Sequence, residues 1–164
     1  MRRKECERDA AFAWEVLKNS IYSTVSMVCP DGTPYATPVN IIGDEVYNAL
    51  YFHCAGAGER WELLAKNPPV CLSAVSYAAA IPNEFSMAYA SAALHGRAEV
   101  VTDEAEQVKA MLLLCTAFDP KGMGRFDQAM AHCPAQVIKI VPEVITGKEH
   151  EMHQEPPKAH TCHS

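Results

Sequence analysis

The sequence lacks the apolar segments that membrane and secreted proteins carry. Its longest nearly apolar runs, 72–81 and 110–118, are shorter than the ~20 residues that a helix needs to cross a bilayer. The basic start, Met1 to Lys4, leads into acidic residues instead of an apolar core, which is unlike a secretory signal. We therefore expect a cytoplasmic protein with no membrane partner.

Positive charge is also scarce. The chain has 14 Lys and Arg against 20 Asp and Glu, for a formal net charge of −6 at pH 7. This balance opposes binding to the phosphate backbone of DNA or RNA, and no basic stripe interleaved with aromatic residues offsets it. Nucleic acid is therefore not an expected partner.

Cysteines are plentiful, but they lack the spacing of a disulfide framework or a zinc ribbon. The seven lie at positions 6, 29, 54, 71, 115, 133 and 162, and none forms a Cys-x-x-Cys pair. Cys71 and Cys115 lie in apolar runs that are typical of core residues. Cys54 follows His53, which leaves open a nucleophilic role, although no second histidine or acid lies nearby in the sequence.

The pattern of apolar residues predicts the fold. At 164 residues and 49% hydrophobic composition, the chain can bury one core. The predicted strands are 21–28, 35–42, 49–54, 70–77, 91–100 and 135–141, and the predicted helices are 5–18, 59–67, 103–118 and 123–131. Because the strands form an antiparallel meander with interrupting helices, we predict a mainly β (α+β) fold, an antiparallel six-stranded barrel with flanking helices.

One strand-loop-helix junction is a candidate anion site. An apolar strand, 51–54, runs into a loop that contains Gly56 and Gly58 and then into a helix that carries Arg60. Unpaired amides at a helix start attract an anion, and an arginine adds a fixed cation of matching geometry. The junction is therefore a candidate phosphate site, with a plain turn as the alternative interpretation.

The segment from Thr146 differs in composition from the rest of the chain. It lacks hydrophobic periodicity and contains His150, His153, His160 and His163 together with Cys162. These ligand types suit Zn²⁺ or Ni²⁺, but their spacing matches no closed structural site, so we assign no metal. We divide the chain into a domain of residues 1–148 and a His-rich tail of residues 149–164.

Several short motifs occur in a familiar order between about Cys6 and Lys148. They are Ser23-Thr24-Val25, Pro30-Asp31-Gly32-Thr33-Pro34-Tyr35, Thr37-Pro38-Val39-Asn40, Tyr51-Phe52-His53-Cys54-Ala55, Arg60 before Asn67-Pro68, Tyr89-x-Ser91 before Gly96-Arg97-Ala98-Glu99-Val100, and Ile138-Lys139-Ile140 to Ile145-Thr146-Gly147-Lys148. This order resembles the FMN-binding split β-barrel superfamily typified by pyridoxamine 5′-phosphate oxidase, and within it the 5-nitroimidazole-resistance proteins. The resemblance implies a split β-barrel over residues 1–148.

The resemblance also implies a homodimer with FMN at the subunit interface. The cofactor-binding residues that it implies are Thr37, Pro38, Val39, Asn40, His53, Cys54, Ala55, Gly58, Arg60, Trp61, Tyr89 and Ser91. Residues 37–40 would lie beside the flavin ring, and residues 53–55 would face the ribityl chain or the ring. Arg60 would neutralise the phosphate, while Tyr89 and Ser91 would line the cofactor across the dimer.

Two departures from the oxidase pattern limit the activity that we expect. Glu59-Arg60 stands where the oxidase has adjacent basic residues, so the acid must point outward. The arginine and histidine pattern that holds the oxidase's substrate phosphate is missing near the C-terminus, so vitamin B6 oxidation is not expected.

The resemblance implies an FMN-dependent oxidoreductase that reduces a small nitroaromatic or quinone-like acceptor. The alternative is an FMN- or haem-binding carrier or sensor without turnover of its own. His53 is the candidate catalytic residue, as an acid or a hydrogen-bond donor, and a residue that caps its strand is the alternative. The flavin would carry the electron chemistry, so no protein nucleophile is required.

Overall fold

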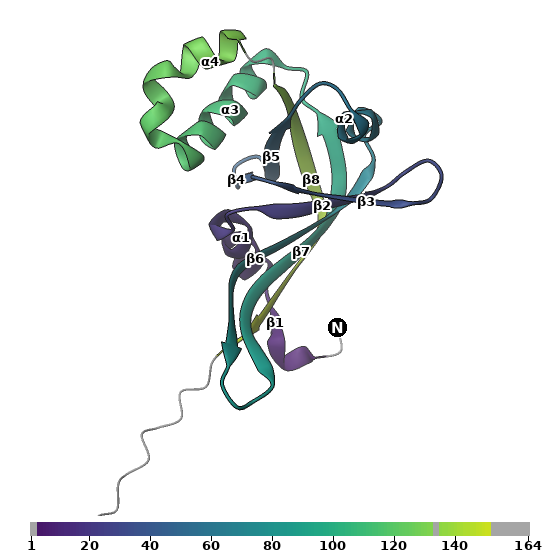
Figure 1. The fold of residues 1–164 in the computed structure, drawn as a ribbon, viewed down its shortest axis with the longest axis vertical. Helices are drawn as coiled ribbons and strands as arrows, with labels where there is room; N and C mark the ends of the chain where they lie inside the picture. The colour runs from purple at the N-terminus through teal and green to yellow at the C-terminus, as the bar shows by residue number, and fades with distance from the viewer. Residues whose placement is uncertain (1–2, 133–134, 152–164) are drawn as a thin grey trace, which may run out of the picture.

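Across residues 3–132 and 135–151, which the computed structural model describes, eight strands form one antiparallel sheet (Figure 1). Hydrogen-bonded neighbours follow the order β3-β2-β6-β7-β8-β5-β4, and β1 pairs with β8. The strands are β1 Glu7–Arg8, β2 Ser23–Val28, β3 Pro34–Val39, β4 Ile42–Asp44, β5 Ala49–Cys54, β6 Pro69–Ile81, β7 Ser86–Val100 and β8 Gln136–His150. The edge strands β3 and β4 do not pair with each other, so the barrel is split.

Helices flank this sheet. Within the same described ranges they are α1 Ala10–Asn19, α2 Glu59–Leu64, α3 Glu104–Phe118 and α4 Phe126–His132, with 3-10 turns at Lys4–Cys6 and Pro120–Arg125. Asp9 and Asp103 accept hydrogen bonds from Phe12 N at 2.9 Å and Glu106 N at 2.8 Å, which caps α1 and α3. None of the described helices is long and apolar enough to cross a membrane.

The predicted mainly β fold with flanking helices is confirmed. The six predicted strands correspond to β2, β3, β5, β6, β7 and β8. The two that the prediction missed, β1 and β4, have 2 and 3 residues, too few to show an alternating pattern. The first predicted helix, 5–18, was placed too early, because β1 comes before α1.

Strands β6, β7 and β8 are longer than predicted and form an arm that extends beyond the barrel (Figure 1). The prediction ended the last strand at Val141, but β8 continues to His150, which pairs with Tyr89. Glu149 and His150, expected in the His-rich tail of residues 149–164, therefore belong to the sheet. His153, His160, Cys162 and His163 lie outside the described residues.

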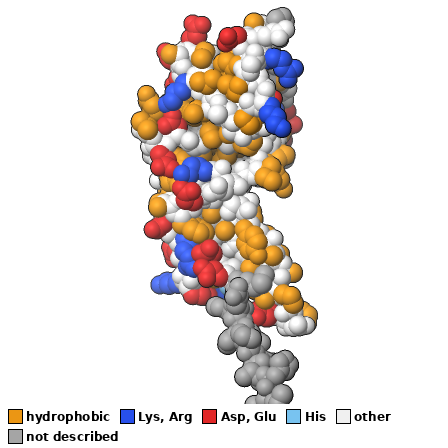
Figure 2. All heavy atoms as spheres, turned by 90° about the vertical axis from the view of Figure 1, so that its left-hand side faces the viewer, with side chains coloured by type: hydrophobic (Ala, Val, Ile, Leu, Met, Phe, Trp, Pro, Cys, Tyr) orange, Lys and Arg blue, Asp and Glu red, His pale blue; other side chains and the backbone are white. Residues whose placement is uncertain are grey.

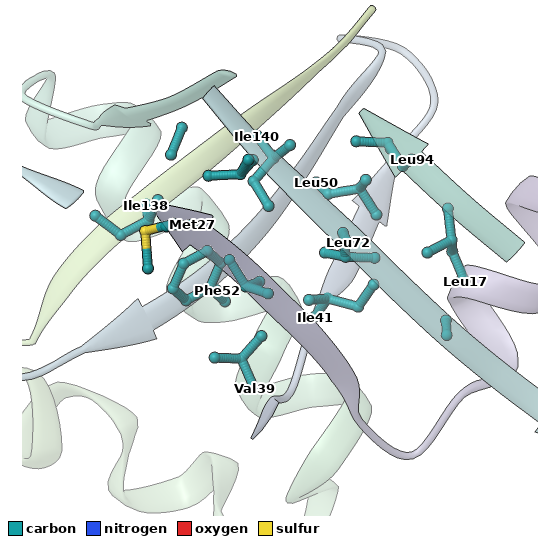
Figure 3. Packing of buried hydrophobic residues seen from close by; sticks show 14 of the residues in the cluster. Leu17, Met27, Val39, Ile41, Leu50, Phe52, Leu72, Leu94, Ile138 and Ile140 are labelled. Atoms are coloured by element: carbon teal, nitrogen blue, oxygen red, sulfur yellow. The ribbon is translucent and has the colours of Figure 1, made fainter. Parts of the chain in front are cut away.

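One hydrophobic cluster fills the barrel and a second lies under α3. Figure 3 shows the first, in which side chains from β2, β5, β6, β7 and β8 meet those of α1. Phe52, Leu72 and Ile138 are among its fully buried members. The second contains Tyr51, Val101, Met111 and Leu114, so α3 covers the outer face of β5. Fully burying one such side chain contributes about 1.5–3 kcal/mol to the stability of the fold. Because both clusters contain side chains of β5, they hold this strand in place.

Candidate functional site

The end of β5 holds the first residue of the candidate site. Side chains alternate along this strand, so Leu50, Phe52 and Cys54 enter the barrel core while Tyr51 and His53 face the other way. His53 is exposed and pairs in register with Val137 on β8. Cys54 is buried at 2% exposure and points into the core, on the opposite face of β5 from His53.

A glycine-containing loop connects β5 to α2. Gly58 is the N-cap of α2 and has φ 90°, a left-handed backbone conformation that glycine adopts without strain. Within the described part of the chain, no side chain caps α2, so no capping group there pairs the amides at its start. The helix has 6 residues, which makes its dipole weak and leaves Arg60 as the main positive charge here.

Arg60 lies close enough to the end of β5 to change its electrostatics. Partial desolvation and then the positive charge of Arg60 lower the pKa of His53, although the imidazole still reaches solvent. Burial raises the pKa of the Cys54 thiol, and Arg60 opposes that rise. At neutral pH, His53 is therefore a neutral imidazole and Cys54 a protonated thiol, which argues against a cysteine nucleophile.

The remaining residues of α2 support this arrangement. Arg60 and Trp61 are half-buried, Leu63 and Leu64 are buried, and Trp61 packs against the barrel core. Glu59 is exposed. An acid beside an anion site must point away from it, and the exposure of Glu59 agrees with that. The buried face of α2 thus anchors Arg60 at the surface next to His53.

Strand β3 lies at one edge of the sheet and carries the second predicted segment. Thr37 is half-buried, Pro38 is exposed and Val39 is buried at 6% exposure. Asn40 follows β3 and donates a hydrogen bond of 2.7 Å from Nδ2 to the Ile21 carbonyl. Val39 points into the core, so what β3 offers a ligand is its backbone edge and the side chains of Thr37 and Pro38.

The barrel core brings these two segments together. Val39 from β3 and Phe52 from β5 point into the same cluster (Figure 3), to which Cys54 and Leu63 also belong. Residues 37–40 and 53–61 are therefore both anchored in this one core. Sequence spacing alone does not reveal this meeting, because it depends on side chains from non-neighbouring strands.

Tyr89 and Ser91 lie elsewhere in the chain's own fold. Both are half-buried on β7, where Tyr89 pairs with His150 on β8. His53 pairs with Val137 near the opposite end of β8. At about 3.3 Å per residue, the stretch of β8 between these partners is on the order of 40 Å long. One chain therefore does not bring Tyr89 and Ser91 to the site at His53.

Gln136 is a polar residue at the site that the sequence pattern did not single out. It pairs with Cys54 in register, and a Cβ on Gly56 would lie 3.2 Å from its Cγ. Gln136 thus packs against the loop between β5 and α2. The only signal in the sequence was its place at the start of a strand, which carries no chemical information.

No group of three or more metal-ligating His, Cys, Asp or Glu side chains occurs within 3–132 and 135–151. The arrangement instead offers a half-buried guanidinium, a neutral imidazole, loop amides and a strand edge. Such a set holds an anionic group at one end and a flat polar group along the strand.

Comparisons with known proteins agree with this fold. Residues 9–149 match the family model described as pyridoxamine 5′-phosphate oxidase. No curated protein sequence matches the chain.

Similar solved structures include a candidate 5-nitroimidazole antibiotic resistance protein from Bacteroides thetaiotaomicron, with TM-score 0.70, 22% identity and coverage of 86% of this chain and 84% of that one. The FAD binding protein from Mycobacterium smegmatis has TM-score 0.67, 18% identity and coverage of 90% and 99%. The FAD and heme binding protein from the same organism has TM-score 0.72, 20% identity and coverage of 90% and 75%. By the match over residues 9–149, this chain belongs to the pyridoxamine 5′-phosphate oxidase family.

Proposed function

We propose that this protein binds FMN with the phosphate at Arg60 and the flavin ring along the edge of β3. The observation that carries the proposal is the position of Arg60, half-buried on α2 and near enough to His53 to lower its pKa. FMN carries a phosphate that is close to a dianion, and a guanidinium fork with nearby amides supplies donors of matching geometry. The residues that the chain presents fit this group.

The ring of FMN requires hydrogen bonds along a flat polar edge, and β3 supports them. Among the residues that the structure describes, no strand pairs with the outer edge of β3, so its backbone groups are available to a ligand. Val39 fixes β3 through the core, and the Asn40 side chain ties its end to Ile21 at 2.7 Å. A ligand at this edge would meet a strand that is already held in place.

We propose further that the functional unit is a homodimer with FMN between the protomers. Tyr89 and Ser91 lie on β7 and pair with one end of β8, whereas His53 pairs near the other end. Within one chain they are therefore too far from His53 to reach the same flavin. The family resemblance assigns them to the cofactor across a dimer. Their separation in one chain supports that assignment, because a second chain is needed to bring them there.

The reaction that we propose is the reduction of a small nitroaromatic or quinone-like acceptor. The flavin supplies the electron chemistry when bound, and the protein supplies orientation and hydrogen bonds. His53 is neutral at pH 7, so its N–H can donate to a bound oxygen atom without adding a full positive charge. Likeness to the nitroimidazole-resistance structure supports this acceptor class.

Identifying the cofactor that the purified protein binds tests this proposal. The protein is purified without added cofactor, its visible spectrum is measured, and any small molecule released on denaturation is identified. We expect FMN, either co-purified or bound after incubation at near one per protomer. Release of FAD would mean that Arg60 contacts a diphosphate instead of a terminal phosphate. Release of haem would support the carrier alternative. Failure to bind any flavin would overturn the proposal.

Turnover then separates an enzyme from a carrier or sensor. FMN-loaded protein is mixed with NADH or NADPH and a nitroaromatic acceptor, and oxidation of the nicotinamide is followed. Acceptor-dependent oxidation supports the oxidoreductase. Retained flavin with no turnover across donors and acceptors would favour the binding module.

A further inference from the structure

Phe85, at the turn between β6 and β7, presents its whole side chain to solvent. Its relative exposure is 106%, and its φ of 49° places a bulky residue in the left-handed backbone region. Asn83, two residues earlier in the same turn, has φ 64°. A turn that adopts two such conformations and leaves a phenyl ring in water is unfavourable on its own, which points to a use for the ring.

The strands behind Phe85 hold it in a fixed position. Strands β6 and β7 stay paired up to Ile81 and Ser86, directly beside the turn. At the end of β8, the His150 ring lies 2.7 Å from the Met87 carbonyl through Nδ1 and packs near the Tyr89 ring, with centroids 6.2 Å apart. The turn is therefore carried by a stiff three-stranded base.

The ring cannot reach the candidate site of its own chain. Of the large β7 side chains in the barrel core, Leu94 is the one nearest to the turn. About 30 Å of chain separates Leu94 from Phe85. His53 lies on the far side of that core, at the opposite end of β8. Phe85 therefore does not line the candidate site of its own chain.

The surface around the arm fits a second copy of this chain. Between Pro69 and Leu94, Glu84 is the only residue with a formal charge. Ile21, Tyr22, Val75 and Tyr77 are between 50% and 80% exposed and line one hollow of about 440 Å³ where the arm meets the barrel. Figure 2 shows hydrophobic side chains interspersed with charged ones along the lower part of the molecule, where the arm lies. The third strand of the arm, β8, carries Glu143, Lys148 and Glu149, so the charge-poor part of the arm is the one formed by β6 and β7. A charge-poor apolar surface is matched by itself across a two-fold axis.

We propose that Phe85 of one protomer forms an aromatic wall of the acceptor pocket beside the flavin of the other. This inference rests on the proposed function, which assigns Tyr89 and Ser91 to the flavin across the dimer. Met87 follows the same face of β7 two residues beyond Tyr89, about 7 Å further along the strand. Phe85 lies in the turn just before β7, within about 13 Å of Tyr89 along the chain, and on this arrangement its ring borders the space next to the flavin. A phenyl wall there selects planar aromatic acceptors by stacking.

Tryptophan fluorescence tests this placement without measuring activity. Phe85→Trp puts an indole at the tip, and Phe118→Trp puts one at the partly exposed end of α3 as a matched control. When FMN is added to each variant, we expect the extra emission of the Phe85→Trp protein to fall several-fold, because the indole lies close to a flavin. The control should lose far less. Equal quenching in both variants, with FMN bound, would overturn the inference.

A binding measurement tests the selectivity. In FMN-loaded dimers, Phe85→Ala should raise the dissociation constant of 4-nitrobenzyl alcohol about tenfold, measured from the shift in flavin absorbance. FMN affinity and dimer mass should stay unchanged. An unchanged dissociation constant would contradict the aromatic wall while leaving the proposed function intact, whereas failure of both proteins to bind FMN would remove the proposed function itself.

Subunit mixing shows whether Phe85 acts on the partner. A hybrid dimer of one Arg60→Ala protomer and one Phe85→Ala protomer contains one site with both residues intact only if Phe85 acts in trans. We expect this hybrid to bind 4-nitrobenzyl alcohol at that one site with wild-type affinity. Weak binding at the site of the Phe85→Ala protomer would place Phe85 in its own site and overturn the inference.

Discussion

The Tyr51 hydroxyl donates a hydrogen bond of 2.7 Å to the Glu106 carboxylate, which ties α3 to the strand that carries His53. Lys139 on β8 contacts the same carboxylate at 3.1 Å. Burial and then this hydrogen bond raise the pKa of Tyr51 above its ordinary value, so the phenol stays protonated and remains a donor. The contact connects the helical layer to the outer face of β5, two residues before His53.

Removing this hydrogen bond should lower stability. Tyr51→Phe leaves the ring in place but removes the donor to a charged group, so we expect a loss of about 1.5–3 kcal/mol in the free energy of unfolding. Urea denaturation measures it. Tyr47→Phe is the control, because Tyr47 is exposed and its ring contact with Lys109 survives the change. An equal loss in both variants would contradict the assigned role.

Glu106 should contribute to acid sensitivity. The hydrogen bond from Tyr51, assisted by Lys139 against the effect of desolvation, lowers the pKa of Glu106. A carboxylate with a lowered folded-state pKa stabilises the fold above its unfolded pKa, and this stability is lost as pH falls through the folded value. Glu106→Gln should therefore flatten the fall in unfolding free energy below about pH 4.5. The exposed Glu104→Gln should leave the slope as it is in the wild type.

Arg60 should contribute to the lowered pKa of His53. Partial desolvation and the Arg60 charge both lower the pKa of His53, so removing the charge should move this pKa up toward its ordinary value. An NMR titration of the imidazole in Arg60→Gln measures the shift. Arg97→Gln is the matched control, since Arg97 bonds to the Asn67 carbonyl at 3.0 Å. An unchanged His53 pKa in Arg60→Gln would mean that the two groups are not electrostatically coupled.

The same arginine should govern FMN affinity. Arg60→Ala removes a charge-assisted hydrogen bond to the proposed phosphate, which is worth about 1.5–3 kcal/mol, or roughly a 10- to 150-fold weaker dissociation constant. Fluorescence titration with FMN measures it, with Arg97→Ala as the control. If both variants bind FMN as the wild type does, the phosphate lies elsewhere on the protein.

Gly96 should tolerate no side chain. A Cβ at this position would lie 2.2 Å from the Val141 carbonyl oxygen, at the bulge where β7 meets β8. Because that contact is backbone, Gly96→Ala must displace a strand, and we expect a loss of at least about 1–3 kcal/mol by thermal or urea unfolding. Gly124→Ala, with no atom within 4 Å of the added Cβ, should stay close to wild type.

The sequence predicted the parts of the fold where one pattern dominates. In the β2–β3 hairpin, Gly32 has φ 86° and Asp31 accepts hydrogen bonds from Thr33, as the turn residues indicated. The β6–β7 part of the arm was missed because both of these strands are rich in alanine there, so no apolar-polar alternation marks residues 78–80 or 88–90.

The candidate site was predictable only in part. The loop before Arg60 was visible because glycine spacing and charge occur next to each other in the sequence. The attachment of β3 and β5 to one core depends on Val39 and Phe52 entering the same cluster, and the position of Gln136 depends on its register with Cys54. Long-range packing and strand register are properties of the folded chain, and no local pattern encodes them.

The two prolines of β3 affect how the protein assembles. Pro34 and Pro38 have no amide hydrogen, and their places in a strand paired to β2 require that the missing donors face away from β2. The free edge therefore offers carbonyl acceptors but lacks two of the donors that an incoming strand would need. A small ligand with its own N–H groups can bind there, whereas a strand from another chain cannot form a continuous ladder. The edge that is open to a cofactor is thus protected against fibre growth.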